Sequence, residues 1–285
     1  MQFTPAAWAF VAISVAAAVL YGVVFEAKPP SLLRAVAKTV FLAALTVAFH
    51  LAGAPNAFVI ALAAAASGDF FLAFDKPWVL PIGMIAFIAM HVFYIVTMLD
   101  LITPEGAEPI WARFALTAAM LIVVLLYLVW FWREPRPGRS PLLAVLAIAG
   151  ALAFGGAPFI IAATGHIDAS PGSINVHPNL PFAGAVLLLA AIFIWLRRDL
   201  GAVKLAGMFY AAIIMQMAYA TFWLPWSGWP AMLGAICFLV SDGVLSAELF
   251  RLKPDAPARR ITGPVVWWTY AAAQLLIAFG VARLV

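Results

Sequence analysis

Two aspartates lie inside long apolar stretches of the chain, Asp69 in AAAASGDFFLAF and Asp242 in LGAICFLVSDGVLSAELF. An ionised carboxylate inside a bilayer is costly, so such acids face a cavity or a partner and usually mark a functional site. If the two share a pocket of low dielectric constant, one proton stays on the pair, and one carboxyl is an acid while the other is a base. This division of roles suits hydrolysis by general acid and base catalysis.

A structural role for the same acids is the main alternative. Asp69 would then pair with Lys38, which lies near the end of a neighbouring apolar stretch, or bond a tyrosine or serine. Asp242 would bond a nearby serine such as Ser241 or Ser246. Buried polar groups of this kind commonly hold membrane helices together.

Other polar residues in the apolar stretches are candidates for substrate contact. His91 and Tyr94 are three residues apart in FIAMHVFYIV and therefore share a helix face, where His91 could position water or a substrate oxygen. Gln274 is a weaker candidate, because amides often bridge helices. Lys38 lies where it could hold a phosphate. We predict no metal and no cofactor, since the histidines of the chain match no ligand spacing.

The composition requires a membrane to position these residues. The chain has 285 residues, of which 66% are hydrophobic and 10% charged, which leaves no room for a soluble domain. Apolar runs of about 20 residues, each long enough to cross a bilayer, recur throughout. We expect a single all-α integral membrane domain, residues 1–285, with about ten transmembrane spans and a retained first helix. The predicted spans are residues 5–25, 33–52, 56–74, 79–99, 110–132, 141–164, 182–197, 204–224, 229–250 and 263–284.

The charges between the spans predict the orientation. Alternate loops are rich in lysine and arginine, and the loops between them are nearly free of cations. Because basic loops stay in the cytoplasm, both termini should be non-cytoplasmic, as in a bacterial-type inner membrane protein. The net charge of +4 comes from these loops and suits anionic lipid headgroups, so we predict neither a nucleic-acid partner nor a protein partner. On these spans Asp69 lies about six residues and Asp242 about nine residues from the cytoplasmic ends of two parallel helices.

Several blocks of the sequence resemble the YhhN-like lysoplasmalogenase family. GDFFLAF followed by GMIAFIAMHVFYIV resembles its Gly-Asp and His-x-x-Tyr helices, GAICFLVSDGVLSAELF its Ser-Asp helix, and WWTYAAAQLLIAFG its last helix. Lys38 is followed by Thr39 where the family has Lys-Pro. Family members have about eight spans, so residues 111–164 would be an inserted hairpin. The residues that match motif positions are Gly68, Asp69, His91, Tyr94, Ser241, Asp242 and Gln274.

The resemblance implies a membrane hydrolase that cleaves the vinyl ether bond of a lysoplasmalogen, a lysophospholipid drawn from the membrane, into a fatty aldehyde and a glycerophospho-headgroup. We expect Asp69 and Asp242 to be catalytic. Substrate contacts are expected from Lys38, His91, Tyr94, Ser241 and Gln274. The alternative function is a proton- or cation-coupled transporter that uses the same acids, although we see no inverted repeat.

Overall fold

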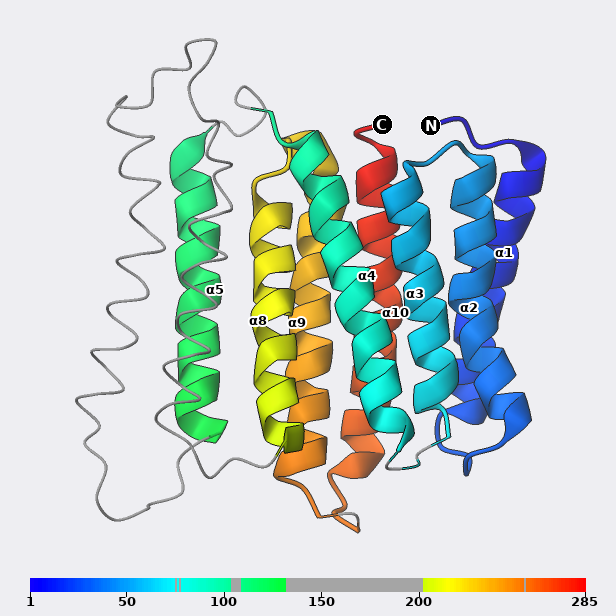
Figure 1. Ribbon diagram of the computed structural model, residues 1–285, viewed down its shortest axis with the longest axis vertical. Helices are drawn as coiled ribbons and strands as arrows, with labels where there is room; N and C mark the ends of the chain where they lie inside the picture. Colours follow the sequence, from blue (N-terminus) through cyan, green and yellow to red (C-terminus); the bar gives the residue numbers. More distant parts are fainter. Residues whose placement is uncertain (75, 77, 104–108, 132–201, 254) are drawn as a thin grey trace. The chain divides into compact units, whose positions relative to one another are not determined.

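The computed structural model describes residues 1–74, 76, 78–103, 109–131, 202–253 and 255–285 (Figure 1). This part of the chain contains eight α-helices and no strand. They are α1 (Pro5–Leu20), α2 (Leu32–Leu51), α3 (Asn56–Leu72), α4 (Val79–Leu101), α5 (Ile110–Phe131), α8 (Ala202–Phe222), α9 (Trp229–Phe250) and α10 (Arg259–Ala282). A short π-helix, η1 (Tyr21–Phe25), extends α1, and a short 3₁₀-helix, η3 (Trp226–Gly228), precedes α9.

The chain divides into two compact units, residues 1–132 with 217–285, and residues 133–216. All seven candidate site residues belong to the first unit. The predicted spans 141–164 and 182–197 lie outside the described residues, so the second half of the expected hairpin does as well. The all-α class is confirmed for the described part, and the total of ten spans stays a prediction.

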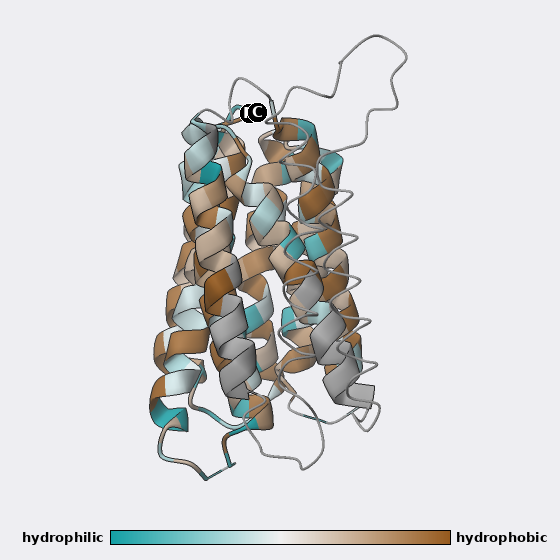
Figure 2. Cartoon of the chain, turned by 90° about the vertical axis from the view of Figure 1, so that its left-hand side faces the viewer, coloured by the Kyte–Doolittle hydropathy of each residue, from teal (hydrophilic) through white to brown (hydrophobic). Residues whose placement is uncertain are grey.

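Five segments of the described chain are long and apolar enough to cross a membrane: Pro5–Phe25, Leu32–Leu51, Val79–Leu101, Trp226–Phe250 and Arg259–Ala282. Asn56–Leu72 is a shorter apolar helix. Hydrophobic residues predominate along the helices, while many hydrophilic ones gather at helix ends (Figure 2). This distribution is that of helices whose outer faces contact lipid.

Local sequence sets where several helices begin. Ser31 accepts a hydrogen bond from the backbone N–H of Arg34 at 3.2 Å and caps the start of α2. Thr4 caps α1 in the same way, and Pro5 occupies the first turn, where its missing N–H is not needed. Gly53, in the turn from α2 to α3, has a φ of 76°, a left-handed conformation that favours glycine.

Helix α10 is the centre of the first unit. Trp267 donates a hydrogen bond to the carbonyl of Ala18 in α1 at 3.0 Å, and Tyr270 reaches Asp69 of α3. Gln274 contacts α4, and α9 packs along the length of α10. Because one helix contacts most of the others, polar residues on α10 can meet polar residues from several parts of the sequence.

Both termini lie at the same end of this unit (Figure 1). The ring of Phe3 contacts those of Phe49 and Phe279, which ties the start of the chain to the ends of α2 and α10. We call this the terminal end. The opposite end carries the cations Lys28, Lys76 and Lys253 and is called the basic end.

Candidate functional site

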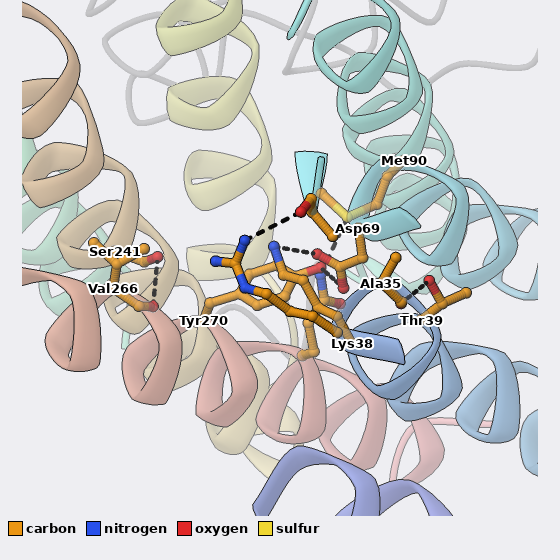
Figure 3. Close-up of polar contacts among 11 residues, drawn as sticks. Ala35, Lys38, Thr39, Asp69, Met90, Ser241, Val266 and Tyr270 are labelled. Atoms are coloured by element: carbon orange, nitrogen blue, oxygen red, sulfur yellow. Dashed lines mark hydrogen bonds and ion pairs between the residues drawn. The ribbon is translucent and has the colours of Figure 1, made fainter. Parts of the chain in front are cut away.

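Asp69 lies near the basic end of α3, where its side chain is fully buried. Its Oδ1 is 3.2 Å from the ammonium of Lys38 on α2, and its Oδ2 accepts a hydrogen bond from the hydroxyl of Tyr270 on α10 at 2.9 Å. Figure 3 shows both side chains converging on the carboxyl group. Each oxygen of Asp69 therefore has its own donor, from a different helix.

The helix that carries Asp69 ends sooner than the hydropathy predicted. α3 stops at Leu72 rather than at residue 74, so Asp69 lies three residues before its end and is closer to the end than predicted. Gly68 allows this segment to pack tightly, because a Cβ there would lie 2.8 Å from the ring of Phe87 on α4.

Aromatic rings surround the ammonium of Lys38. Its Nζ lies 5.9 Å from the ring centroid of Tyr21 and 5.8 Å from that of Trp267. A cation within about 6 Å of an aromatic face is stabilised by the ring quadrupole. The side chain of Lys38 is 17% exposed, so the ammonium is held mainly by Asp69 and the two rings.

Tyr270 is fixed in position by rings from three other helices. Phe41, Phe87 and Phe238 all approach its ring edge-on, with centroid distances of 6.5, 5.9 and 5.7 Å. This geometry is favourable for aromatic pairs. The tyrosine hydroxyl is therefore directed at Asp69 by packing as well as by its hydrogen bond.

A second buried polar contact lies one turn further along α10. The hydroxyl of Tyr94 donates a 2.6 Å hydrogen bond to Oε1 of Gln274, whose Nε2 is 3.2 Å from the sulfur of Met90. Tyr94 and Gln274 are both fully buried. Their contact joins α4 to α10. The side-chain amide of Gln274 is therefore already engaged by Tyr94 and Met90.

His91 is fully buried on α4. Its Nδ1 lies 2.7 Å from the carbonyl oxygen of Phe87, and because a carbonyl only accepts, this nitrogen carries the ring proton. The ring packs edge-on against Phe238 of α9 at 4.8 Å. The imidazole therefore lies beside Phe238, which precedes Asp242 by one helical turn on α9.

Ser241 and Asp242 lie together on α9 but face differently. Ser241 is buried and donates a 3.0 Å hydrogen bond to the carbonyl of Val266 on α10. Asp242 is partly exposed. In Figure 3 the contact of Ser241 with Val266 is set apart from the group around Asp69.

Charged residues also meet at the basic end, beyond the apolar helices. Arg34 donates to the carbonyl of Ala73 at 3.1 Å, which links α2 to the end of α3. Burial raises the pKa of the Glu26 carboxyl; Arg34 counteracts this effect and the nearby Glu248 adds to it. Glu248 accepts a hydrogen bond from Thr262. The two hydrogen bonds link α2 to the end of α3 and α9 to α10.

The structure thus brings some of the predicted residues into contact, namely Lys38 with Asp69 and Tyr94 with Gln274. Within the described part of the chain, Asp69 makes its polar contacts with Lys38 and Tyr270. The ion pair with Lys38 is the contact proposed in the structural alternative. A proton shared directly by Asp69 and Asp242 stays a prediction.

Tyr270 was not among the site residues predicted from the sequence. One signal was available, because Tyr270 precedes Gln274 by four residues in WWTYAAAQ and so lies on the same face of α10. Chemically, the site offers a buried carboxylate held by Lys38 and Tyr270, and a second carboxyl, that of Asp242, which is partly exposed. Among the described residues, no group of three His, Cys, Asp or Glu side chains could hold a metal ion.

Comparison with known proteins identifies relatives. Residues 32–174 and 142–281 match the YhhN family. Proteins named lysoplasmalogenase from Mycobacterium bovis and Mycobacterium tuberculosis are each 26% identical to this chain over 242 residues, or 85% of its length. The match spans 66% of the length of each relative, slightly less than two thirds. No solved structure matches the chain.

Proposed function

Because the chain belongs to the YhhN family, we propose that it is a membrane hydrolase that cleaves the vinyl ether bond of a lysoplasmalogen. Its five long apolar helices fit an integral membrane protein. The name of the two mycobacterial relatives supports the substrate class. The observation that carries the proposal is the fully buried carboxyl of Asp69, in a segment that matches the family.

The proposed reaction consumes one water. A proton is added to the vinyl carbon remote from oxygen, which turns the adjacent carbon and the ether oxygen into an oxocarbenium ion. Water attacks that carbon and loses a proton, and the hemiacetal collapses to a fatty aldehyde and the free glycerol hydroxyl. The protein must supply a proton donor and a negative charge near the developing cation, as paired acids do in glycoside cleavage.

Asp69 and Asp242 are the residues we propose for these two tasks. They lie on α3 and α9, and Tyr270 of α10 contacts Asp69 directly and Phe238 of α9 through its ring. Phe238 is one turn before Asp242. A vinyl ether between α3 and α9 would then be near both carboxyl groups, with His91 on the adjacent α4 to orient water.

The lysolipid is proposed to enter from the leaflet at the basic end, with its alkenyl chain between helices. Lys38 is engaged by Asp69, so the contact that we expected between its ammonium and the substrate phosphate is better supplied by exposed cations such as Lys28 and Lys76. These lie at the end of the helices where a headgroup would be.

Replacing either acid by its amide tests the proposal. Asp69→Asn and Asp242→Asn should each lower aldehyde release from lysoplasmalogen by about 100-fold or more, since acid and base groups contribute factors of that size. Asp100→Asn is the matched control, because Asp100 is an exposed aspartate at the terminal end of α4. Size-exclusion elution of each variant measures folding. Full activity in Asp69→Asn or Asp242→Asn would remove that residue from the mechanism.

A carrier using the same acids makes a different prediction. In a proton-coupled carrier the acid must gain and lose a proton during transport. Asp69 instead forms an ion pair with the ammonium of Lys38 at 3.2 Å, which favours its charged form. We therefore expect proteoliposomes containing the protein to release aldehyde from lysoplasmalogen. Proton flux dependent on Asp69, without aldehyde release, would favour the carrier.

A further inference from the structure

We infer that Lys38 and Tyr270 are positioning residues that keep Asp69 ionised, so that Asp69 stabilises the developing cation and Asp242 donates the proton. The inference rests on the proposed function and assigns roles within it. It adds Tyr270, which is not among the predicted site residues. It also gives Lys38 a different role, since Lys38 now binds a catalytic carboxylate instead of the substrate.

The contacts of Asp69 are those of a carboxylate. Its two oxygens lie 3.2 Å from the Lys38 ammonium and 2.9 Å from the Tyr270 hydroxyl. A nearby positive charge and a hydrogen bond to the charged form both favour ionisation. An ionised carboxylate only accepts hydrogen bonds, which agrees with Tyr270 as the donor.

The aromatic surroundings of Lys38 stabilise the positive charge of its ammonium group. Tyr21 and Trp267 present their rings to the ammonium, and these two rings are 4.2 Å apart. Trp267 is held in turn by its 3.0 Å hydrogen bond to Ala18. Arg34, also on α2, has its guanidinium carbon 5.8 Å from the ring centroid of Tyr21. Among the described residues, Lys38 of α2 and Tyr270 of α10 contact Asp69 directly, while Tyr21 of η1 contacts Lys38 and Arg34.

Asp69 and Asp242 differ in how deeply their side chains are buried, and this difference is the basis for assigning their roles. A residue that gives its proton to a carbon atom must regain one from water in every turnover. The side chain of Asp242 is partly exposed, whereas that of Asp69 is fully buried between Lys38 and Tyr270. We therefore assign the proton-donating role to Asp242, the less buried of the two acids, and the permanently charged role to Asp69.

The pH profile of Tyr270→Phe tests the assignment. Activity should fall at low pH as Asp69 gains a proton and at high pH as Asp242 loses one. Without the Tyr270 hydroxyl, Asp69 takes up a proton more readily, so the acid limb should move up by about one to two pH units. The alkaline limb should stay in place. Tyr219→Phe is the control, since Tyr219 is a buried tyrosine of α8 that packs against Trp223, and its profile should match the wild type.

Two results of this comparison would overturn the inference. One is a uniform loss of activity in Tyr270→Phe with both limbs unmoved, which would indicate a purely structural role. The other is a shift of the alkaline limb instead of the acid limb, which would exchange the roles of the acids.

Infrared spectroscopy provides a readout that needs no substrate, because protonated carboxyl groups and carboxylates absorb at different frequencies. At neutral pH, Asp69→Asn should remove carboxylate absorption and leave the protonated carboxyl absorption unchanged. Loss of a protonated carboxyl signal in Asp69→Asn would overturn the inference. If the wild-type protein releases no aldehyde, the proposed function fails, while this measurement still decides whether Asp69 is ionised.

Discussion

At the scale of single residues, the buried ion pair explains how an aspartate is tolerated inside an apolar helix. A carboxylate without a partner in lipid is unfavourable by several kcal/mol, and an ammonium at hydrogen-bonding distance offsets much of that cost. Lys38 supplies the charge and Tyr270 the second donor. The contacts that stabilise Asp69 are also the contacts that we infer to set its chemical role.

Removing the lysine should destabilise the protein unless the aspartate is removed as well. Lys38→Met leaves a buried carboxylate unpaired, which costs about 3–5 kcal/mol in buried pairs. Adding Asp69→Asn to Lys38→Met should restore the yield and the thermal stability of the folded protein, but not aldehyde release. Size-exclusion elution after heating measures both effects, with the exposed Lys28→Met as control. A stable Lys38→Met single variant would contradict the importance of the pair.

The opposite change is expected to be milder. Asp69→Asn alone leaves Lys38 with the rings of Tyr21 and Trp267, and a long lysine side chain can redirect its ammonium toward the basic end. This is why we expect that variant to fold while losing activity.

At the scale of helices, close packing of α9 on α10 sets the height of Asp242 relative to Tyr270. The two backbones approach at glycines: a Cβ on Gly234 would lie 2.9 Å from the carbonyl oxygen of Ala273, and one on Gly280 would meet the backbone nitrogen of Ala231. Small residues allow such approach where lipid supplies no hydrophobic driving force between helices.

Alanine at these glycines should separate the two helices. Gly234→Ala and Gly280→Ala place a methyl group against backbone atoms that cannot move aside, an overpacking that costs about 1–3 kcal/mol. We expect a lower melting temperature and reduced aldehyde release in both variants. Gly243→Ala is the matched control on α9, because a Cβ there meets nothing within 4 Å. Equal stability of all three variants would show that the close approach is not required.

At the scale of the whole molecule, the distribution of charge predicts which side of the membrane each end faces. The termini meet at one end of the first unit, and Lys28, Lys76 and Lys253 lie at the other. If cations stay in the cytoplasm, the basic end and the entrance for the lipid headgroup are cytoplasmic.

Cysteine labelling can measure this orientation, because the chain has a single native cysteine, Cys237. In a Cys237→Ala background, Gln2→Cys should react with a membrane-impermeant maleimide in intact bacterial cells. Lys253→Cys should react only after the cells are permeabilised. Both positions are exposed, so they form a matched pair. The reverse pattern would invert the predicted topology and the leaflet from which the lipid is drawn.

The sequence by itself determined the helical, membrane-spanning character and the positions of most described helices. The predicted spans 79–99 and 229–250 correspond to Val79–Leu101 and Trp229–Phe250, and 33–52 to Leu32–Leu51. Hydropathy and helix length are local properties of the chain, and bilayer thickness converts them directly into spans. Helix ends depend on caps and turns, which is why α3 and α10 differ from prediction by a few residues.

Only the tertiary structure decided which polar side chains meet. It pairs Lys38 with Asp69, joins Tyr94 to Gln274, and brings Tyr270 to Asp69 from 201 residues away. Such contacts depend on the rotation and height of each helix against its neighbours, and these are set by the packing of many residues on α10 rather than by any one segment. The sequence therefore identified the acids, and helix packing determined their partners.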